Sequence, residues 1–222
     1  MLKLKKIIIL GIGGNSIDIF DAINEINKLA QIPPYECIGF LDDDKAHRNK
    51  NICGVKVLGI LEDAKNFTDA YFINGIGNEK NYMHKETIIG KTNISLERFI
   101  TIIHPTASVS RLSMLGLGVV VFQNATIASN AKIGNHAIIL PNSIVSHDVI
   151  IGDYTIVTGG VCISGGAIIG KSCYFGTNSS IIGNISIGEH SLIGMGSVVL
   201  KDVPSSSVFV GNPAKFLRRI NE

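Results

Sequence analysis

His147 and Asp148 are the neighbouring side chains best suited to acid–base chemistry in this sequence of 222 residues. A neutral imidazole accepts a proton near pH 7, and an adjacent carboxylate holds the ring in one tautomer and stabilises the imidazolium that forms. The pair therefore predicts a general base. From these residues alone a structural role stays open, because His136 and His190 occupy corner positions in the repeat described below.

A glycine-rich turn is the second candidate site. The segment Gly11–Ser16 follows an apolar run, Ile7–Leu10, and precedes an amphipathic stretch, Ile17–Leu29, so the order predicts a strand, a turn and a helix. Backbone N–H groups at a helix N-terminus attract phosphate, which makes the turn a candidate nucleotide cradle. The alternative is a tight turn in which Asn15 or Ser16 caps the helix, because Ser16 stands where a dinucleotide motif has its third glycine.

Further segments complete the first hundred residues. We expect strands at Cys37–Leu41 and Tyr71–Asn74, a short strand and turn at Val55–Leu61, and a helix at Tyr82–Thr92. Alternating strands and helices predict an α/β domain with a small parallel sheet and Rossmann-like winding over residues 1–100. Ligands bind at the carboxyl ends of such strands, so Asp42 and Asp43 are expected near the ribose or base of a nucleotide.

The carboxyl-terminal half has a six-residue repeat. Every sixth residue from Ile103 to Val199 is apolar, and the residue four places after each of these is uncharged, so both kinds point to one side of short strands. The residue three places after most apolar positions is of a type that tolerates positive φ. These corner residues are Gly118, Asn124, Asn130, His136, Asn142, Asp148, Gly160, Gly166, Asn178, Asn184, His190, Gly196 and Asp202. The repeat predicts a solenoid whose units bury their apolar faces by stacking.

Composition narrows the functional classes. A net charge of +2 gives no reason to expect nucleic acid, and no apolar run approaches the ~18 to 20 residues that span a bilayer. The four cysteines form no close pair, which favours reduced thiols in the cytoplasm. Only six residues between 103 and 199 are charged, so we expect a flat face of the solenoid to be hidden against other copies of the chain.

Several motifs in a fixed order carry a family resemblance. They are Gly11–Gly14, Ile38–Asp43, Gly75–Asn78, Ile103–Pro105, Ser146–Asp148, the hexads and Gly211–Lys215. In this order the chain resembles the sugar acetyltransferases grouped with the sialic acid O-acetyltransferases, and most of all those that acetylate nucleotide-linked 4-amino-4,6-dideoxy sugars. The resemblance implies an all-β, left-handed parallel β-helix of about five coils over residues 101–203, a capping tail at 204–222, and a homotrimer.

The resemblance also implies a function and site residues. It implies direct transfer of an acetyl group from acetyl-CoA to a sugar amine, with His147 as the base, Asp148 as its partner and no metal. The nucleotide sugar would contact Gly13, Gly14, Asn15, Asp42, Asp43 and Gly77. The acetyl-CoA would lie near Ile156, Gly165, Thr177, Gly194, Met195 and Lys215, where Ile156 stands at the place of a second histidine in many relatives.

Three rival functions are open at this stage. The same base acting on a hydroxyl group would make the protein a sugar O-acetyltransferase. A zinc-dependent carbonic anhydrase also uses this β-helix, but it needs three converging imidazoles, and His104, His136, His147 and His190 are widely spaced. A non-catalytic sensor of sugar nucleotides would keep the front domain and use the solenoid as a scaffold.

Overall fold

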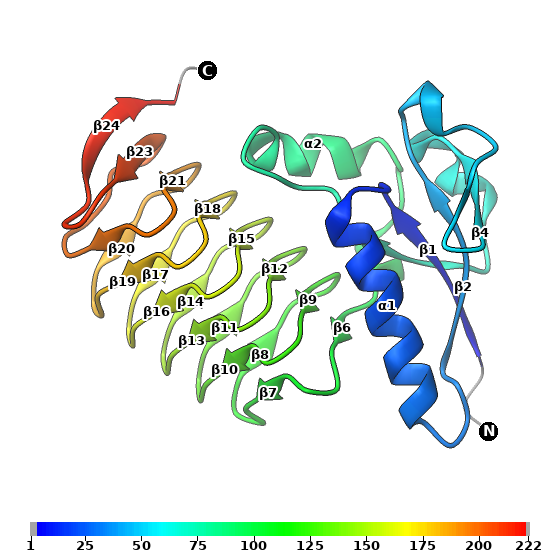
Figure 1. Cartoon of the computed structure of the whole chain (residues 1–222), viewed down its shortest axis with the longest axis horizontal. Helices are drawn as coiled ribbons and strands as arrows, with labels where there is room; N and C mark the ends of the chain where they lie inside the picture. Colours follow the sequence, from blue (N-terminus) through cyan, green and yellow to red (C-terminus); the bar gives the residue numbers. More distant parts are fainter. Residues whose placement is uncertain (1–3, 221–222) are drawn as a thin grey trace.

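A computed structural model describes residues 4–220, and it has two parts in close contact (Figure 1). An α/β domain contains the amino-terminal strands and helices, and a three-sided coil of short strands follows it and ends far from the N-terminus (Figure 1). No helix among the described residues combines the length and the hydropathy needed to cross a membrane.

The front domain is built on a five-stranded sheet in the order β3-β4-β2-β1-β5. Its strands are β1 (Lys5–Leu10), β2 (Tyr35–Leu41), β3 (Asn51–Ile52), β4 (Val55–Gly59) and β5 (Tyr71–Asn74). All neighbouring strands are parallel except β3 and β4, which form an antiparallel pair. The expected all-parallel sheet is therefore a mixed one, because the short turn at Cys53 and Gly54 can only return the chain antiparallel.

Two α-helices and four short 3₁₀ turns connect these strands. They are α1 (Gly14–Leu29), α2 (Lys85–Gly90), η1 (Lys45–His47), η2 (Leu61–Asn66), η3 (Tyr82–His84) and η4 (Leu96–Arg98). α1 begins within the glycine-rich turn, three residues before the expected start. The helix expected at Tyr82–Thr92 is a 3₁₀ turn followed by the six residues of α2.

The coil has three flat walls of parallel two-residue strands, paired in a register of eighteen residues. The first wall contains β6 (Ile102–Ile103), β9 (Val120–Val121), β12 (Ile138–Ile139), β15 (Ile156–Val157), β18 (Tyr174–Phe175) and β21 (Leu192–Ile193). The second contains β7 (Ser108–Val109), β10 (Thr126–Ile127), β13 (Ile144–Val145), β16 (Cys162–Ile163), β19 (Ser180–Ile181) and β22 (Val198–Val199). The third contains β8 (Met114–Leu115), β11 (Lys132–Ile133), β14 (Ile150–Ile151), β17 (Ile168–Ile169) and β20 (Ser186–Ile187). Three hexads thus make one turn of a left-handed β-helix.

The hexad pattern correctly located the core of this coil. Its inward apolar residues form one buried cluster from Val119 to Val203, with Val109 and Leu115 partly buried at the first coil. Ile103 is the exception: its side chain is 38% exposed, because no earlier coil stacks on it.

The corner residues also follow the prediction, with three differences. Twelve of the thirteen expected positions have positive φ, and Asp202 does not. Tyr154 (φ 62°) and Ser172 (φ 51°) stand in the same eighteen-residue columns and take this conformation although neither side chain favours it.

The front domain covers the first wall. Outward side chains of that wall, Ile102, Val120 and Ile138, share a buried cluster with Ile9 of β1 and Ile23 of α1. α1 accordingly lies between the front sheet and the first coils (Figure 1). Because the two parts share a core, the relative position of their functional groups is set by packing rather than by a linker.

A hairpin follows the last coil. Strand β23 (Ser207–Val210) extends the first wall by pairing parallel with β21, and β24 (Lys215–Arg219) pairs antiparallel with β23. The expected tail at 204–222 therefore adds two strands to the first wall, and residues 221–222 lie outside the described part.

Candidate active site

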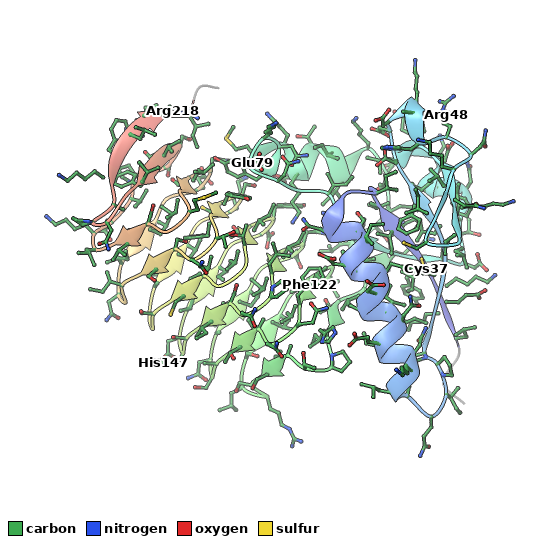
Figure 2. All side chains as sticks on the ribbon, viewed as in Figure 1. Cys37, Arg48, Glu79, Phe122, His147 and Arg218 are labelled. Carbon is green, nitrogen blue, oxygen red and sulfur yellow. The ribbon has the colours of Figure 1, made fainter. Side chains whose placement is uncertain are left out.

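His147 projects from the edge between the second and third walls, where Figure 2 places it away from the front domain. Its Nδ1 lies 2.7 Å from Asp148 Oδ2, and both side chains are more than half exposed. Asn130, one coil earlier, donates from Nδ2 to Asp148 Oδ1 at 3.1 Å. Hydrogen bonds from His147 and then from Asn130 lower the pKa of Asp148, so the carboxylate stays ionised and accepts the Nδ1 proton. This leaves His147 Nε2 as the ring nitrogen that is free to take a proton.

Gly165 stands one coil after His147, directly beside the imidazole. A Cβ atom at Gly165 would lie 2.6 Å from His147 Cε1 and 2.7 Å from Nε2, so any side chain there would displace the ring. Within residues 4–220 no atom accepts a hydrogen bond from the Gly165 amide, whereas its carbonyl accepts from Asn184. A free N–H next to a basic nitrogen is the arrangement that a developing oxyanion requires.

The front domain holds a cleft of about 320 Å³ at the carboxyl ends of β1, β2 and β5. Its lining residues are Gly11, Ile12, Gly13, Gly14, Asn15, Asp42, Gly75, Ile76, Gly77, Asn78 and Asn81. The structure thus brings together five of the six residues expected at the nucleotide. A cleft at this position of an open parallel sheet is where nucleotides usually bind.

The first turn of α1 faces this cleft without a side-chain cap. Asn15 instead donates from Nδ2 to the Gly77 carbonyl at 3.0 Å, and the Ser16 hydroxyl donates to the Leu10 carbonyl. The alternative in which Asn15 or Ser16 caps the helix is therefore wrong. Within residues 4–220 the Gly14 and Asn15 amides at the start of α1 stay available for a negatively charged ligand, whereas the Ser16 amide donates to the Gly13 carbonyl.

Asp42 and Asp43 have different surroundings. Asp42 lines the cleft and accepts from the Ile12 amide at 3.1 Å, so it fixes the glycine-rich turn. Asp43 points away from the cleft, where it accepts from the Leu61 amide and pairs with Lys91 at 2.8 Å. Partial burial opposes ionisation of Asp43, but the bonds from Lys91 and Leu61 outweigh it and lower the pKa of this carboxyl. Asp43 thus holds η2 and α2 in place.

The residues expected near acetyl-CoA do not form one group within a single chain. Thr177 and Met195 stack on successive coils at the edge between the first and second walls, and Met195 is 80% exposed. Gly194 uses its amide in a hydrogen bond to the Phe209 carbonyl, and Lys215 lies on exposed β24. Ile156 is buried under the front domain, where a Cβ at Gly77 would touch its side chain.

Two residues in or beside the cleft escaped the sequence analysis. Asn81 lines the cleft, and its side chain accepts from the Asn78 amide at 2.8 Å. His47 is not part of the lining but contacts it, with Nδ1 3.1 Å from Asp42 Oδ1. The two asparagines at 78 and 81 are typical of a turn, and this pattern could have pointed to Asn81. His47 has no such local pattern, because the turn η1 brings it against Asp42.

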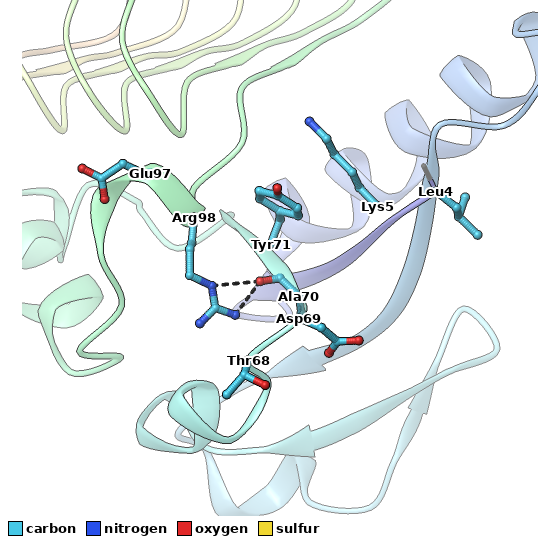
Figure 3. A pocket seen from close by; sticks show the side chains of 8 residues that line it. All are labelled: Leu4, Lys5, Thr68, Asp69, Ala70, Tyr71, Glu97 and Arg98. Carbon is cyan, nitrogen blue, oxygen red and sulfur yellow. Dashed lines mark hydrogen bonds between the residues drawn. The ribbon is translucent and has the colours of Figure 1, made fainter. Parts of the chain in front are cut away.

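A larger hollow of about 580 Å³ lies at the edge strand β5 (Figure 3). Its basic groups are already used: Arg98 donates to the Ala70 and Phe67 carbonyls, and Lys5 lies over the Tyr71 ring. These contacts hold η4 and the start of β1 to β5. The hollow is remote from both His147 and the glycine-rich turn, so its size does not make it the active site.

The four histidines considered for zinc lie on three different edges of the coil. His104 is at the first corner, His147 at the second, and His136 and His190 share the third edge three coils apart. Within residues 4–220 no three His, Cys, Asp or Glu side chains converge as metal ligands would. The carbonic anhydrase alternative therefore has no ligand set in this part of the chain.

Comparisons with known proteins agree with this architecture. The family model of the PglD N-terminal domain matches residues 6–84, and that of the bacterial transferase hexapeptide (six repeats) matches residues 130–165 and 166–201. A search among curated protein sequences gives no significant match.

Solved structures of whole chains are similar. The acetyltransferase domain of PglB from Neisseria gonorrhoeae FA1090, in complex with acetyl coenzyme A, has 23% identity and a TM-score of 0.84 over 97% of this chain and 100% of that one. PerB from Caulobacter crescentus, in complex with CoA and GDP-perosamine, has 25% identity and a TM-score of 0.80 over 96% and 97%. A histidine-to-alanine variant of GDP-perosamine N-acetyltransferase from the same organism has 24% identity and a TM-score of 0.82 over the same shares. The two family models match residues 6–84 and 130–201, so the chain is similar to PglD-type hexapeptide-repeat transferases over both of its parts.

Proposed function

We propose that the protein transfers the acetyl group of acetyl-CoA to the amino group of a nucleotide-linked amino sugar. The observation that carries the proposal is the arrangement of His147, Asp148 and Gly165 on one edge of the coil. It offers a basic nitrogen, an ionised partner and a free amide within one small area. The likeness to proteins solved with acetyl coenzyme A, and with CoA and GDP-perosamine, supports the same pair of substrates.

We propose a role for each of these groups. As the sugar nitrogen attacks the thioester carbonyl, His147 Nε2 takes a proton from the nitrogen, and Asp148 stabilises the imidazolium. The Gly165 amide donates to the oxyanion of the tetrahedral intermediate, which then expels the CoA thiolate and forms the amide. Ile156 has no hydrogen-bonding group, so the place of the second histidine in many relatives contributes nothing to this charge.

The cleft of the front domain is the proposed site for the nucleotide. Its size, its uncapped helix terminus and Asp42 at the carboxyl end of β2 suit a phosphate group and a ribose or base. We propose Gly13, Gly14, Asn15 and Gly77 as the backbone and amide contacts of this ligand. Thr177, Met195 and Lys215 remain proposed contacts of the acetyl-CoA.

The cleft and His147 lie on opposite sides of one chain. The front domain covers the first wall, and His147 stands on the edge between the other two, so one chain cannot place a single sugar at both. We propose that copies assemble as a homotrimer in which the cleft of one subunit meets His147 of another. Exposed Met114, Ile150 and Ile168 on the third wall provide the apolar surface for this contact. Light scattering on the full chain should give the mass of three copies, and a monomer would contradict the assembly.

An activity assay tests the proposed reaction. The full chain is mixed with acetyl-CoA and UDP-, dTDP- or GDP-linked 4-amino-4,6-dideoxy sugars, and the released CoA is measured with a thiol reagent. We expect release with at least one amino sugar and a product whose acetyl group resists hydroxylamine, as an amide does and an ester does not. The matching sugars with a hydroxyl in place of the amine are the controls. Release with the hydroxyl sugars alone, or with none of the panel, would overturn N-acetylation.

A further inference from the structure

Lys85 is a buried cation without a counter-ion. The side chain is fully buried at the first residue of α2, and its ammonium has a single hydrogen bond, 2.5 Å long, to the His136 carbonyl. Within residues 4–220 no carboxylate pairs with it. A buried charge with one neutral partner is costly, and the start of a helix disfavours a cation. A compensating anion from outside the chain would remove this cost.

The stem of Lys85 lies behind the wall of the cleft. A Cβ atom at Gly77 would be 3.7 Å from Lys85 Cδ, and the ammonium is two bonds further along the side chain. Gly77 lines the cleft, and its carbonyl accepts from Asn15 at the start of α1. The stem of Lys85 thus packs against the backbone of a residue that lines the cleft.

The cleft itself has no positive side chain in its lining. Glycines, isoleucines and asparagines make up the wall, and Asp42 is its single charged residue. A nucleotide sugar carries a diphosphate, so in this cleft it would face a negative side chain and no cation in direct contact. The uncapped terminus of α1 supplies part of the missing charge, and Lys85 is a buried lysine whose stem packs against Gly77.

The other groups around Lys85 are neutral or turned away. The His136 ring stacks on Tyr154 at 5.2 Å and meets the edge of Phe99. Burial, and next the charge of Lys85, lower the pKa of His136 to about 4, so the ring is neutral near pH 7. Glu86, the next residue of α2, is exposed and lies 3.8 Å from Lys171. No group within the fold therefore neutralises the ammonium.

Building on the proposed function, we propose that Lys85 is the counter-charge of the nucleotide diphosphate, acting through the Gly77 wall without touching the ligand. In the low dielectric of the interior, the field of a unit charge is screened much less than that of an exposed lysine. Lys85 is in this sense a positioning and binding residue, and it would explain how a cleft with no positive side chain in its lining holds a dianion.

Burial also makes this charge sensitive to pH, since it lowers the pKa of Lys85 to about 7. The cation is present below that value and is lost as the pH rises through it. Affinity for the diphosphate should therefore fall between pH 6 and pH 8.5, a range in which a nucleotide sugar keeps its charge. Asp42 lines the cleft and is in contact with His47, so the slope must be assigned with a Lys85 variant.

The test uses the full chain and binding rather than turnover. UDP-glucose, dTDP-glucose and GDP-mannose are titrated by calorimetry, and the corresponding nucleosides by ligand-observed NMR. Lys85→Met should lower the affinity for the bound nucleotide sugar by about tenfold or more, and this affinity should no longer depend on pH. The affinity of the variant for the nucleoside should stay within about twofold of that of the unmodified protein. Lys85→Arg, which keeps the charge, should retain most of the affinity. Lys65→Met, an exposed lysine on η2, is the matched control and should change neither ligand.

Each alternative outcome is decisive. Equal losses for nucleoside and nucleotide sugar would show a purely structural role, and no loss for either would show that the charge does not reach the ligand. If Lys85→Met does not fold, as judged by circular dichroism, a flat pH profile of the unmodified protein would by itself overturn the proposal. If the unmodified protein binds and acetylates a nucleotide sugar and Lys85→Met binds it with the same affinity, this inference alone is refuted. No binding of any nucleotide sugar to the unmodified protein would instead refute the proposed function and this inference with it.

Discussion

At the scale of single residues, the feature that sets His147 apart is its place one residue before a corner. Asp148 takes the left-handed conformation (φ 59°), and so do His136 (φ 56°) and His190 (φ 60°) at their corners. His147 therefore does not make the bend, and its ring is free to stand out from the edge. The backbone turn at Asp148 brings the carboxylate back to Nδ1 of the preceding residue. His136 and His190 are therefore the histidines that serve as corner residues, and His147 is not one of them.

Replacing His147 by Ala should lower kcat/KM by about 10²- to 10⁴-fold, because the sugar nitrogen then has no base. Asp148→Asn should cause a smaller loss, since the ring remains but its tautomer is no longer held. Both are measured by CoA release, with light scattering to confirm an unchanged assembly. His190→Asn, at a corner where Asn is equally suited, is the control and should stay within about twofold of the original. Near-normal activity of His147→Ala would remove the assignment.

Gly165 tests the geometry around the ring. A methyl group at this position would overlap His147, so Gly165→Ala should reduce kcat at least about tenfold while the coil stays folded. Gly90→Ala in α2 is the matched control, because a Cβ there meets nothing within 4 Å. Activity and circular dichroism are measured for both. If Gly165→Ala kept full activity, neither the ring position nor the neighbouring amide would matter as proposed.

At the scale of elements, the joint between α2 and the coil decides how the cleft is held. Tyr82 of η3 donates to the His190 carbonyl at 3.1 Å, and Lys85 of α2 donates to the His136 carbonyl. Figure 1 shows α2 reaching along the first wall from the front domain. The segment that carries Gly77 and Asn81 is therefore fastened to two corners of the coil, which gives the cleft a rigid wall.

The buried ring of His136 makes this joint sensitive to acid. Its folded pKa of about 4 is below the ordinary value of 6.5, so between these values the unfolded chain binds a proton that the folded chain does not. Stability therefore falls as the pH falls, by about 2 kcal/mol between pH 7 and pH 5. We choose His136→Asn because Asn suits the positive φ at this corner. In urea unfolding at both pH values, the free energy of unfolding of this variant should no longer fall by that amount. An identical pH dependence in the variant would contradict a buried neutral imidazole.

At the scale of the whole molecule, the separation of cleft and base implies shared active sites. The front domain lies over the first wall, whereas His147 is on the opposite edge in Figure 2. A closed ring of copies brings such distant surfaces together, because each subunit presents one of them to the next. In the proposed trimer, assembly is then a condition of activity.

Mixed assemblies test this arrangement. His147→Ala removes the base, and Gly14→Glu places a carboxylate at the phosphate cradle, where a Cβ meets nothing within 4 Å. Each variant alone should be inactive by CoA release. Co-expressed in equal amounts, they should recover about a quarter of the original activity, since that share of sites combines an intact cleft with an intact neighbouring base. No recovery in proven mixed trimers would show that cleft and base act within one chain.

Parts of the front domain were predictable from local sequence. The buried apolar runs located β1, β2 and β5 within two residues, and the amphipathic period located α1 apart from its first turn. α2 was not predictable in its true length, since Tyr82 and Lys85 are held by carbonyl groups of corners far along the chain. The cleft was predicted from its glycines, but loop conformations that no short pattern records bring Asn81 into the cleft and His47 against Asp42.

The sequence by itself determined the coil: a six-residue period of apolar and positive-φ residues acts locally, so strands, corners and inward side chains follow wherever the repeat continues. It also determined that His147 and Asp148 are adjacent. Only the tertiary structure decided which wall the front domain covers, because the outward apolar residues Ile102, Val120 and Ile138 recur every eighteen residues and are hidden in a six-residue pattern. That packing put the cleft and the base on opposite sides and buried Lys85 between the two parts, and contacts between distant segments, unlike a repeat, leave no periodic mark in the chain.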